Sequence, residues 1–537
     1  MAMKISSRED SASVGKRIRE LLDADQLTEA ISFAESCEGP RSVTDQVRAS
    51  VYTHIGALRG DRAQLESAAE LWRRAGADTQ NQIGYNLANT ELDLWELTQR
   101  ELGFVPAFQD HRAHLRDART LFRRAGDDEA VPLATRIQAL TNLGNSYDRM
   151  GRDIEAIEAY DSVLALDPAF GMALGNKAIA LLDVAPLAGS HHRTVAAEGA
   201  EALDAALADE KRIIEFGLPQ ALEHFRARRA KIKTRPGFVP PHRKKPEWAD
   251  PYLRWCAEQS LFLHVSLTCL SEASEDVDPL FFGGVTADID DAGQQRANDL
   301  FDAFNSLKQD FTAARYLLWL ADGPESPIRE HAAESAARAS YLDTLRYARW
   351  GPRTGMAIQA FASATNLLDK VACAVHMYYR TDRKSRTVAF RYLWHPKHGK
   401  NAPDVMDAEL VDAAERRALR ALCDLSCELE TDTPLNRLVE RRHAATHRFL
   451  AVHRLPRLGE EPAGDWLDHV DWDDLVTGTV TILGTARSAL IYLARMIDIE
   501  EKGAARKRKE DAAESGVPTL TPPLPLLRSI PEHREFE

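Results

Sequence analysis

A short helical pattern that recurs along the first third of the chain limits the possible folds most strongly. A small residue is followed four positions later by an aromatic residue, and in two copies of three a second alanine closes the pattern. The copies are Ala68-Trp72-Ala75, Ala118-Phe122-Ala125 and Ala156-Tyr160-Val163. On a helix these positions share one face, where small side chains let another helix approach and the ring fills the space between. The recurrence predicts stacked helical hairpins, each burying its apolar face against the next.

The third copy belongs to a longer motif of 34 residues that starts at Ile137. Its defining positions are held by Leu143, Gly144, Tyr147, Ala156, Tyr160 and Pro168. This segment resembles a tetratricopeptide repeat, and residues 16–225 resemble a tetratricopeptide (TPR) solenoid with insertions such as 103–110. The resemblance implies a concave face that binds a protein or peptide ligand. The alternative is that this face packs against the rest of the chain.

Length and composition indicate a soluble protein with several domains. The chain has 537 residues, 44% of them hydrophobic and 28% charged, so about three domains are expected. The first twenty residues contain no apolar run, and the best apolar stretch, 476–493, is interrupted by Arg487. Six cysteines in so long a chain do not form a disulfide framework. We therefore expect a cytoplasmic, reduced protein without a membrane segment.

The charge distribution points to one basic segment in an otherwise acidic chain. The net charge of −14 argues against a surface built to coat nucleic acid. Residues 225–245 nevertheless carry nine Lys or Arg and no acidic residue, with several prolines. We expect a linker at 226–250, and its arginines and lysines could contact an RNA backbone. A solvated interdomain linker is the alternative. The RNA-contact candidates here are Arg229, Lys231 and Lys233.

The second half of the chain predicts long helices, so the expected fold class is all-α. Helical patterns occur near 291–321, 326–349, 355–379, 403–428, 435–452 and 473–501. We divide this half into a helical connecting region at 251–350 and a helical bundle at 351–501. The basic, proline-rich residues 502–537 are expected to be disordered, and residues 1–15 to form an N-terminal tail.

One spacing in the predicted helix 435–452 suggests chemistry. Arg442 and His447 are spaced Arg-x4-His. A histidine can carry a proton near neutral pH, and an arginine can stabilise the extra negative charge of a phosphate transition state. Arg441 and Arg448 flank the pair as RNA-binding candidates. A solvated basic face is the alternative, and Arg448 repeats the same spacing with a histidine at position 453.

The bundle resembles a HEPN domain. The resemblance rests on FASATNLLDKVACAVHMYY, on the segment 388–394 (VAFRYLW) and on LNRLVERRHAATHRF. It implies a metal-independent endoribonuclease that needs no cofactor, with Arg442 and His447 as catalytic residues. It also implies a homodimer in which two copies of the motif face each other, and a role in phage defence, toxin systems or stress responses. Many active members have Asn directly after the motif arginine, whereas this chain has His443. The expected supporting residues are His443, Asn366, Asp369 and Lys370, and surface charge is the alternative for Asp369 and Lys370.

Two other interpretations stay open. The first is a non-catalytic TPR–HEPN scaffold that binds RNA or a protein partner. The second is a metal enzyme, because His443 and His447 are spaced like two zinc ligands on a helix. No glutamate lies between them as in His-Glu-x-x-His, which weakens this interpretation. In the ribonuclease interpretation the ribose 2′-OH attacks the neighbouring phosphate, and the TPR half controls the HEPN half.

Overall fold

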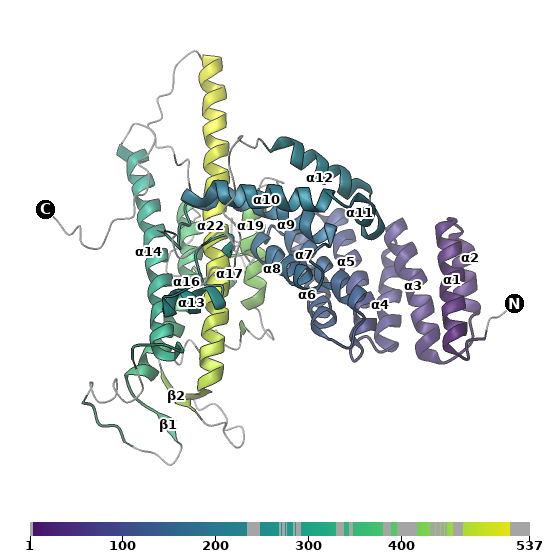
Figure 1. The fold of residues 1–537 in the computed structure, drawn as a ribbon, viewed down its shortest axis with the longest axis horizontal. Coiled ribbons are helices and arrows are strands. Elements are labelled where there is room, and N and C mark those ends of the chain that lie inside the picture. The colour runs from purple at the N-terminus through teal and green to yellow at the C-terminus, as the bar shows by residue number, and fades with distance from the viewer. Residues whose placement is uncertain are drawn as a thin grey trace, which may run out of the picture. The chain divides into compact units, whose positions relative to one another are not determined.

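The computed structural model describes most of the chain, which divides into two units (Figure 1). The first unit takes its described residues from 4–182 and 198–232, and the second from 183–197 and 248–515. The described residues are 4–217, 219–232, 248–267, 270, 274, 276–282, 285, 291–328, 338–342, 347–379, 388–394, 416–429, 435–436, 441, 445, 448–454 and 466–515.

The first unit is built from helices that pair in sequence order. The antiparallel pairs are α1 (Arg8–Asp23) with α2 (Leu27–Ser36), α3 (Arg41–Arg59) with α4 (Arg62–Arg74), α5 (Asn81–Leu102) with α6 (Phe104–Asp127), and α7 (Leu133–Arg149) with α8 (Asp153–Leu166). The helices that follow are α9 (Gly171–Val184), α10 (His192–Leu207), α11 (Glu210–Phe216) and α12 (Pro219–Lys231). The 3-10 turns η1 (Ala185–Leu187) and η2 (Gly189–His191), with the last residues of α9 and the first of α10, belong to the second unit.

The recurrent sequence pattern forms the core of these hairpins. All three aromatic rings, Trp72, Phe122 and Tyr160, are buried, and so are the small residues around them. Gly144 on α7 shows why a small residue is needed. A Cβ atom there would lie 2.4 Å from the ring of Tyr160 on α8, so no larger side chain fits without moving the ring. The close helix–helix approach that the pattern predicts is therefore present.

The second unit is a helical bundle centred on its last helix. Its helices are α13 (Pro251–Glu258), α14 (Asp291–Asp322), α16 (Pro352–Tyr379), α17 (Phe390–Leu393), α19 (Arg417–Ser426) with the turn η7 (Cys427–Leu429), and α22 (Trp472–Ser515). α22 packs against α14, α16 and α19. It is long and apolar enough to cross a membrane, but 83% of its most apolar window is buried inside the structure. Such burial is typical of the core helix of a water-soluble domain.

A small sheet in the second unit corrects the all-α prediction. β1 (Ala348–Arg349) pairs antiparallel with β2 (Phe449–His453), which pairs parallel with β3 (Leu467–Asp471). Figure 1 shows β1 and β2 at the end of the bundle where α22 begins. The helix predicted at 435–452 was therefore wrong at its last residues. Of the helix predicted at 326–349, the structure describes 326–328, 338–342 and 347–349, and none of these residues is helical. Short apolar runs fit a helix or a strand equally well, and pairing with distant segments decides between them.

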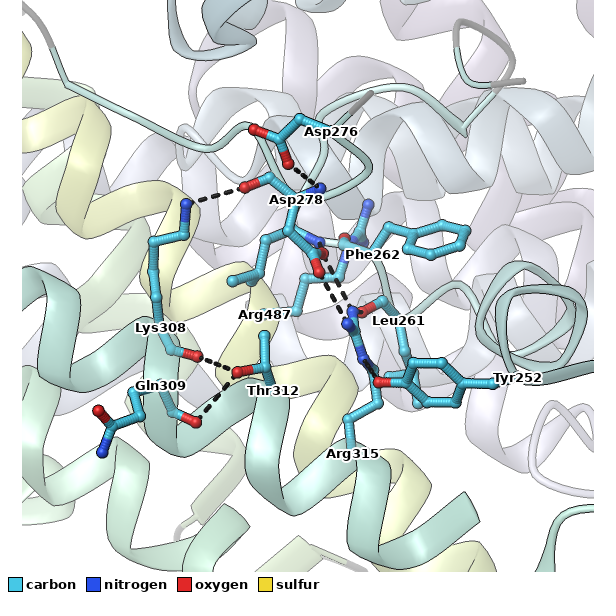
Figure 2. Close-up of polar contacts among 11 residues, drawn as sticks. Tyr252, Leu261, Phe262, Asp276, Asp278, Lys308, Gln309, Thr312, Arg315 and Arg487 are labelled. Carbon is cyan, nitrogen blue, oxygen red and sulfur yellow. Dashed lines mark hydrogen bonds and ion pairs between the residues drawn. The ribbon is translucent and has the colours of Figure 1, made fainter. Parts of the chain in front are cut away.

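Buried cations attach the segment after α13 to the bundle. The guanidinium of Arg315 on α14 donates to both carboxylate oxygens of Asp278, at 2.7 and 3.0 Å, and to the carbonyl of Leu261 at 2.8 Å (Figure 2). Arg487 on α22 donates to the carbonyls of Phe262 and His264, at 2.7 and 2.8 Å. The two helices thus satisfy backbone carbonyls of a segment that has little regular structure of its own.

Three predicted boundaries differ from the helix ends. α1 begins at Arg8, inside the N-terminal tail predicted at 1–15. α12 continues to Lys231, into the linker predicted at 226–250, and α22 continues to Ser515, beyond the predicted bundle end at 501. Of the helix predicted near 403–428, the structure describes 416–428, which contains α19.

Candidate functional site

The motif residues Arg442 and His447, and His443 beside them, lie outside the described residues. The described part of the same segment carries a helical hydrogen bond, in which the N–H of Ala445 donates to the carbonyl of Arg441 at 3.0 Å. A bond between residues four apart is the repeating bond of an α-helix. Ala445 is therefore helical, as predicted for this segment, whereas Arg441 lies in a turn.

The second match to the spacing, Arg448 with His453, is explained by the sheet. Arg448 is exposed just before β2, whereas His453 at the end of β2 is buried. The Nε2 atom of His453 lies 2.8 Å from Nδ1 of His469, a buried residue of β3. A histidine held inside the sheet cannot share an exposed phosphate with Arg448. This second match is therefore a strand contact and not another catalytic pair.

Asp369, a predicted supporting residue, holds the start of α17. Its Oδ1 atom accepts the backbone N–H of Phe390 at 2.9 Å, and Phe390 itself is buried. The residue before α17 supplies no side-chain cap, so a carboxylate from α16 satisfies a donor that the helix start leaves unpaired. One turn further along α16, burial and then the Asp369 carboxylate raise the pKa of the Cys373 thiol.

Arg391 is a residue that the sequence analysis missed. It lies on α17, and its Nη1 atom donates to Oδ1 of Asn436 at 2.9 Å. Asn436 is buried and lies six positions before Arg442 in the chain. An arginine inside the aromatic run VAFRYLW was the available signal, because a cation in an apolar segment needs a polar partner. The hydrogen bond of Asp369 with Phe390 joins α16 to α17, and that of Arg391 with Asn436 joins α17 to the segment before the motif.

The other predicted supporting residues lie on the surface of α16. Asn366 is exposed, and Lys370 forms an ion pair with Asp310 of α14. Such exposed pairs contribute little to stability. Arg441, an RNA-binding candidate, is half-buried.

The basic-segment candidates belong to the first unit where they are described. Arg229 on α12 donates to both carboxylate oxygens of Asp204 on α10, at 2.6 and 2.9 Å. Lys231 is exposed at the end of α12, and Lys233 lies outside the described residues. The ion pair with Asp204 occupies the guanidinium, so binding of a phosphate by Arg229 would have to displace a carboxylate.

Metal-ligating side chains do not gather in the described part of the protein. No group of three or more His, Cys, Asp or Glu residues there could hold a metal ion. His443 and His447 fall outside that part, and the response of the protein to a chelator would test them as a pair of ligands.

Comparison with known proteins identifies the domain that contains the motif. A search of curated proteins found no match to the chain. Residues 292–500 match the family model described as LA2681-like HEPN, and this range extends from α14 to α22 and includes the motif. The chain therefore carries an LA2681-like HEPN domain at residues 292–500, after an N-terminal helical region.

Proposed function

We propose that the protein is a metal-independent endoribonuclease with Arg442 and His447 as its catalytic residues. The observation that carries the proposal is an Arg-x4-His pair inside residues 292–500, the part matched by a HEPN model. HEPN domains form a family of candidate ribonucleases. Histidine can transfer the protons and arginine can stabilise the charged phosphorane when no metal supplies charge or activates a nucleophile.

The proposed reaction uses the ribose 2′-OH of the RNA as nucleophile. This oxygen attacks the neighbouring phosphorus, and the bond from phosphorus to the 5′-oxygen of the next nucleotide breaks. His447 takes the proton from the 2′-OH or gives one to the leaving 5′-oxygen. Arg442 stabilises the added charge on the phosphorane through paired N–H donors. The products are a 2′,3′-cyclic phosphate and a 5′-hydroxyl, and no water or metal is consumed.

A homodimer would complete this site. One histidine cannot remove a proton and donate another in the same step, whereas two copies of the motif supply both functions. A two-fold axis places the same surface patch of each subunit opposite its copy. The dimer would form through the HEPN domain, and light scattering should give about twice the mass of a 59.8 kDa chain.

The N-terminal half is proposed to be a TPR solenoid that controls the HEPN domain. Its support is the paired helices whose buried small and aromatic residues follow the repeat pattern. Binding of a protein or peptide on the concave face would change the activity of the nuclease half. Phage defence, a toxin system or a stress response in the cytoplasm fits such an arrangement.

Incubation of the purified protein with total RNA, with and without EDTA, tests the activity. Wild type should cleave in both, and the products should end in 2′,3′-cyclic phosphate. His447→Ala should not cleave, while an exposed control on α16, Gln359→Ala, should cleave like wild type. Normal cleavage by His447→Ala, or loss of cleavage in EDTA, would contradict the proposal.

A non-catalytic scaffold is the second candidate, and one observation favours it. His443 stands where many active HEPN members have Asn after the motif arginine. A scaffold would bind RNA or a partner but leave RNA intact in every form tested. If His443→Asn produced cleavage that wild type lacks, the natural chain would be the scaffold.

A further inference from the structure

The last part of α22 projects beyond the helices that surround the rest of it. Glu501 accepts the hydroxyl of Tyr378 and the guanidinium of Arg296, each at 2.9 Å. Tyr378 lies at the end of α16 and Arg296 near the start of α14, so α16 ends and α14 begins close to Glu501, yet α22 continues to Ser515. At 1.5 Å per residue this continuation is about 20 Å long, and Figure 1 shows it in yellow, running past the start of α14. We call residues 502–515 the α22 extension.

The α22 extension has the composition of a helix that does not depend on packing. Its sequence, KGAARKRKEDAAES, consists mostly of Ala, Lys, Arg and Glu, which have high helix propensity. The packed part of α22 supplies the first turns, so the extension needs only propagation, which is the favourable step of helix formation. The prediction that residues 502–537 are disordered was therefore wrong for 502–515. The extension contains no large apolar residue, so burial of an apolar face cannot be the reason for its length.

Exposed cations surround the α22 extension. Arg506, Lys507 and Lys509 are exposed, and none of the three forms an ion pair or a hydrogen bond with another residue that the structure describes. Arg508, between them, is partly exposed. Successive residues of an α-helix turn by about 100°, so these four residues place positive charge on every side of the helix. Residues 502–509 contain no acid, although the chain as a whole carries a net charge of −14. The extension is therefore a local positive surface on an acidic protein.

We propose that the α22 extension binds the phosphate backbone of RNA without sequence preference. Lysines and arginines that neutralise phosphates supply the sequence-independent part of nucleic-acid binding. A helix that lies on a membrane needs an apolar face that enters the lipid, and the extension has no residue to form one. This inference rests on the proposed ribonuclease function, which makes RNA the polyanion that the protein meets. It adds an element that holds the RNA outside the helical bundle.

The salt dependence of RNA binding measures these contacts separately from cleavage. The probe is a fluorescein-labelled 12-nucleotide 2′-O-methyl RNA of mixed sequence, which lacks the nucleophilic hydroxyl and cannot be cleaved by the proposed route. Anisotropy with the full-length protein gives the Kd at salt concentrations from about 50 to 200 mM. Each neutralised phosphate of a single strand adds about 0.7 to the slope of log affinity against log salt. The triple variant Arg506→Gln, Lys507→Gln, Lys509→Gln should therefore lower this slope by about 2 and weaken binding at least about tenfold at 50 mM salt.

The control is a second triple variant, Lys16→Gln, Arg19→Gln, Arg59→Gln, which removes the same charge from exposed positions of α1 and α3. It should bind with the slope of wild type. Glutamine has a helix propensity close to that of lysine and arginine, so circular dichroism should show unchanged helix content in both variants. The proposal is refuted if wild type does not bind the probe at 50 mM salt, or if the two triple variants change the slope equally.

Two parallel measurements separate RNA binding by the α22 extension from lipid binding and from the cleavage reaction itself. Sedimentation with vesicles of phosphatidylserine and phosphatidylcholine tests the lipid surface. If the substitutions in the extension abolish vesicle binding but leave the RNA slope unchanged, the extension binds membranes and the RNA proposal is overturned. Unmodified RNA is incubated with wild type. Binding of the probe that depends on the extension, without cleavage of this RNA, supports the extension and rejects the ribonuclease function. Cleavage of this RNA, with probe binding that does not depend on the extension, does the reverse.

Discussion

Replacing Arg315 by methionine tests whether the contacts in Figure 2 hold the second unit together. Arg315 is almost fully buried, and its guanidinium donates to Asp278 and to the carbonyl of Leu261, as well as to the hydroxyl of Tyr252 at 2.8 Å. Burial alone would lower the pKa of this guanidinium, but the Asp278 carboxylate outweighs burial and raises that pKa. Methionine keeps a long apolar side chain and removes the charge and the donors.

The expected cost follows from what Arg315→Met leaves behind. Asp278 would remain a largely buried carboxylate without its cation, and removing one partner of a buried ion pair costs about 3–5 kcal/mol. The N–H of Leu263 still donates to Asp278 at 2.6 Å, so we expect the lower value, about 3 kcal/mol. Adding Asp278→Asn removes the unpaired charge, and the double variant should recover about 1 kcal/mol relative to the single one.

Urea unfolding of the full-length protein, followed by hydrogen exchange of peptides from α14, measures this cost in the second unit. The control is Lys370→Met, whose partly exposed ion pair with Asp310 joins α16 to α14 and should contribute less than about 1 kcal/mol. The reasoning is refuted if Arg315→Met destabilises α14 no more than the control. It is also refuted if adding Asp278→Asn to Arg315→Met recovers nothing.

Three more outcomes are expected. His447→Ala should lower RNA cleavage by roughly a hundred- to ten-thousandfold without changing the melting temperature. Arg442→Lys should restore only part of the cleavage that Arg442→Ala loses, because lysine cannot donate two parallel hydrogen bonds to a phosphate. Cleavage assays and thermal melts of each variant check both. Burial raises the pKa of Asp93 to about 6, so ionisation of this carboxyl destabilises the folded state as pH rises from about 4 to 6. Asp93→Asn should therefore stabilise the first unit by about 1–3 kcal/mol at pH 8 and much less at pH 4. Urea unfolding at the two pH values measures the difference. Burial raises the pKa of the Cys256 thiol to about 12, so iodoacetamide at pH 8 should label this cysteine only after unfolding, which peptide mass spectrometry detects.

The helices could be predicted from the sequence where packing is encoded locally. Trp72, Phe122 and Tyr160 are buried because small residues one turn away let a second helix approach, and that relation is visible within eight positions of sequence. α14 and α16 were predicted within a few residues for the same reason, since their apolar stripes repeat at helical spacing. The described residues are mostly helical, so the all-α prediction holds apart from the small sheet.

The sheet and the contacts near the motif could not be predicted because they depend on distant partners. Nothing in FLAVH distinguishes a strand from the end of a helix until Ala348 and Leu467 are known to lie beside it. The spacing placed Asp369 on a polar stripe but could not show that it accepts the N–H of Phe390, 21 residues later. The contact of Arg391 with Asn436 spans 45 residues and has no periodicity that a sequence could reveal.

The extent of the folding unit bears on how the proposed chemistry is tested. The family match begins at residue 292, yet the buried Arg487 and the half-buried Lys308 within it donate to acceptors that come earlier in the chain. Arg487 donates to carbonyls at 262 and 264, and Lys308 donates to those at 278 and 280. Each buried donor left without its acceptor costs about 1–3 kcal/mol, a large share of a domain's total stability. A fragment of 292–500 lacks these acceptors, so the roles of Arg442 and His447 must be tested in the full-length protein, where the contacts to residues 262–280 are intact.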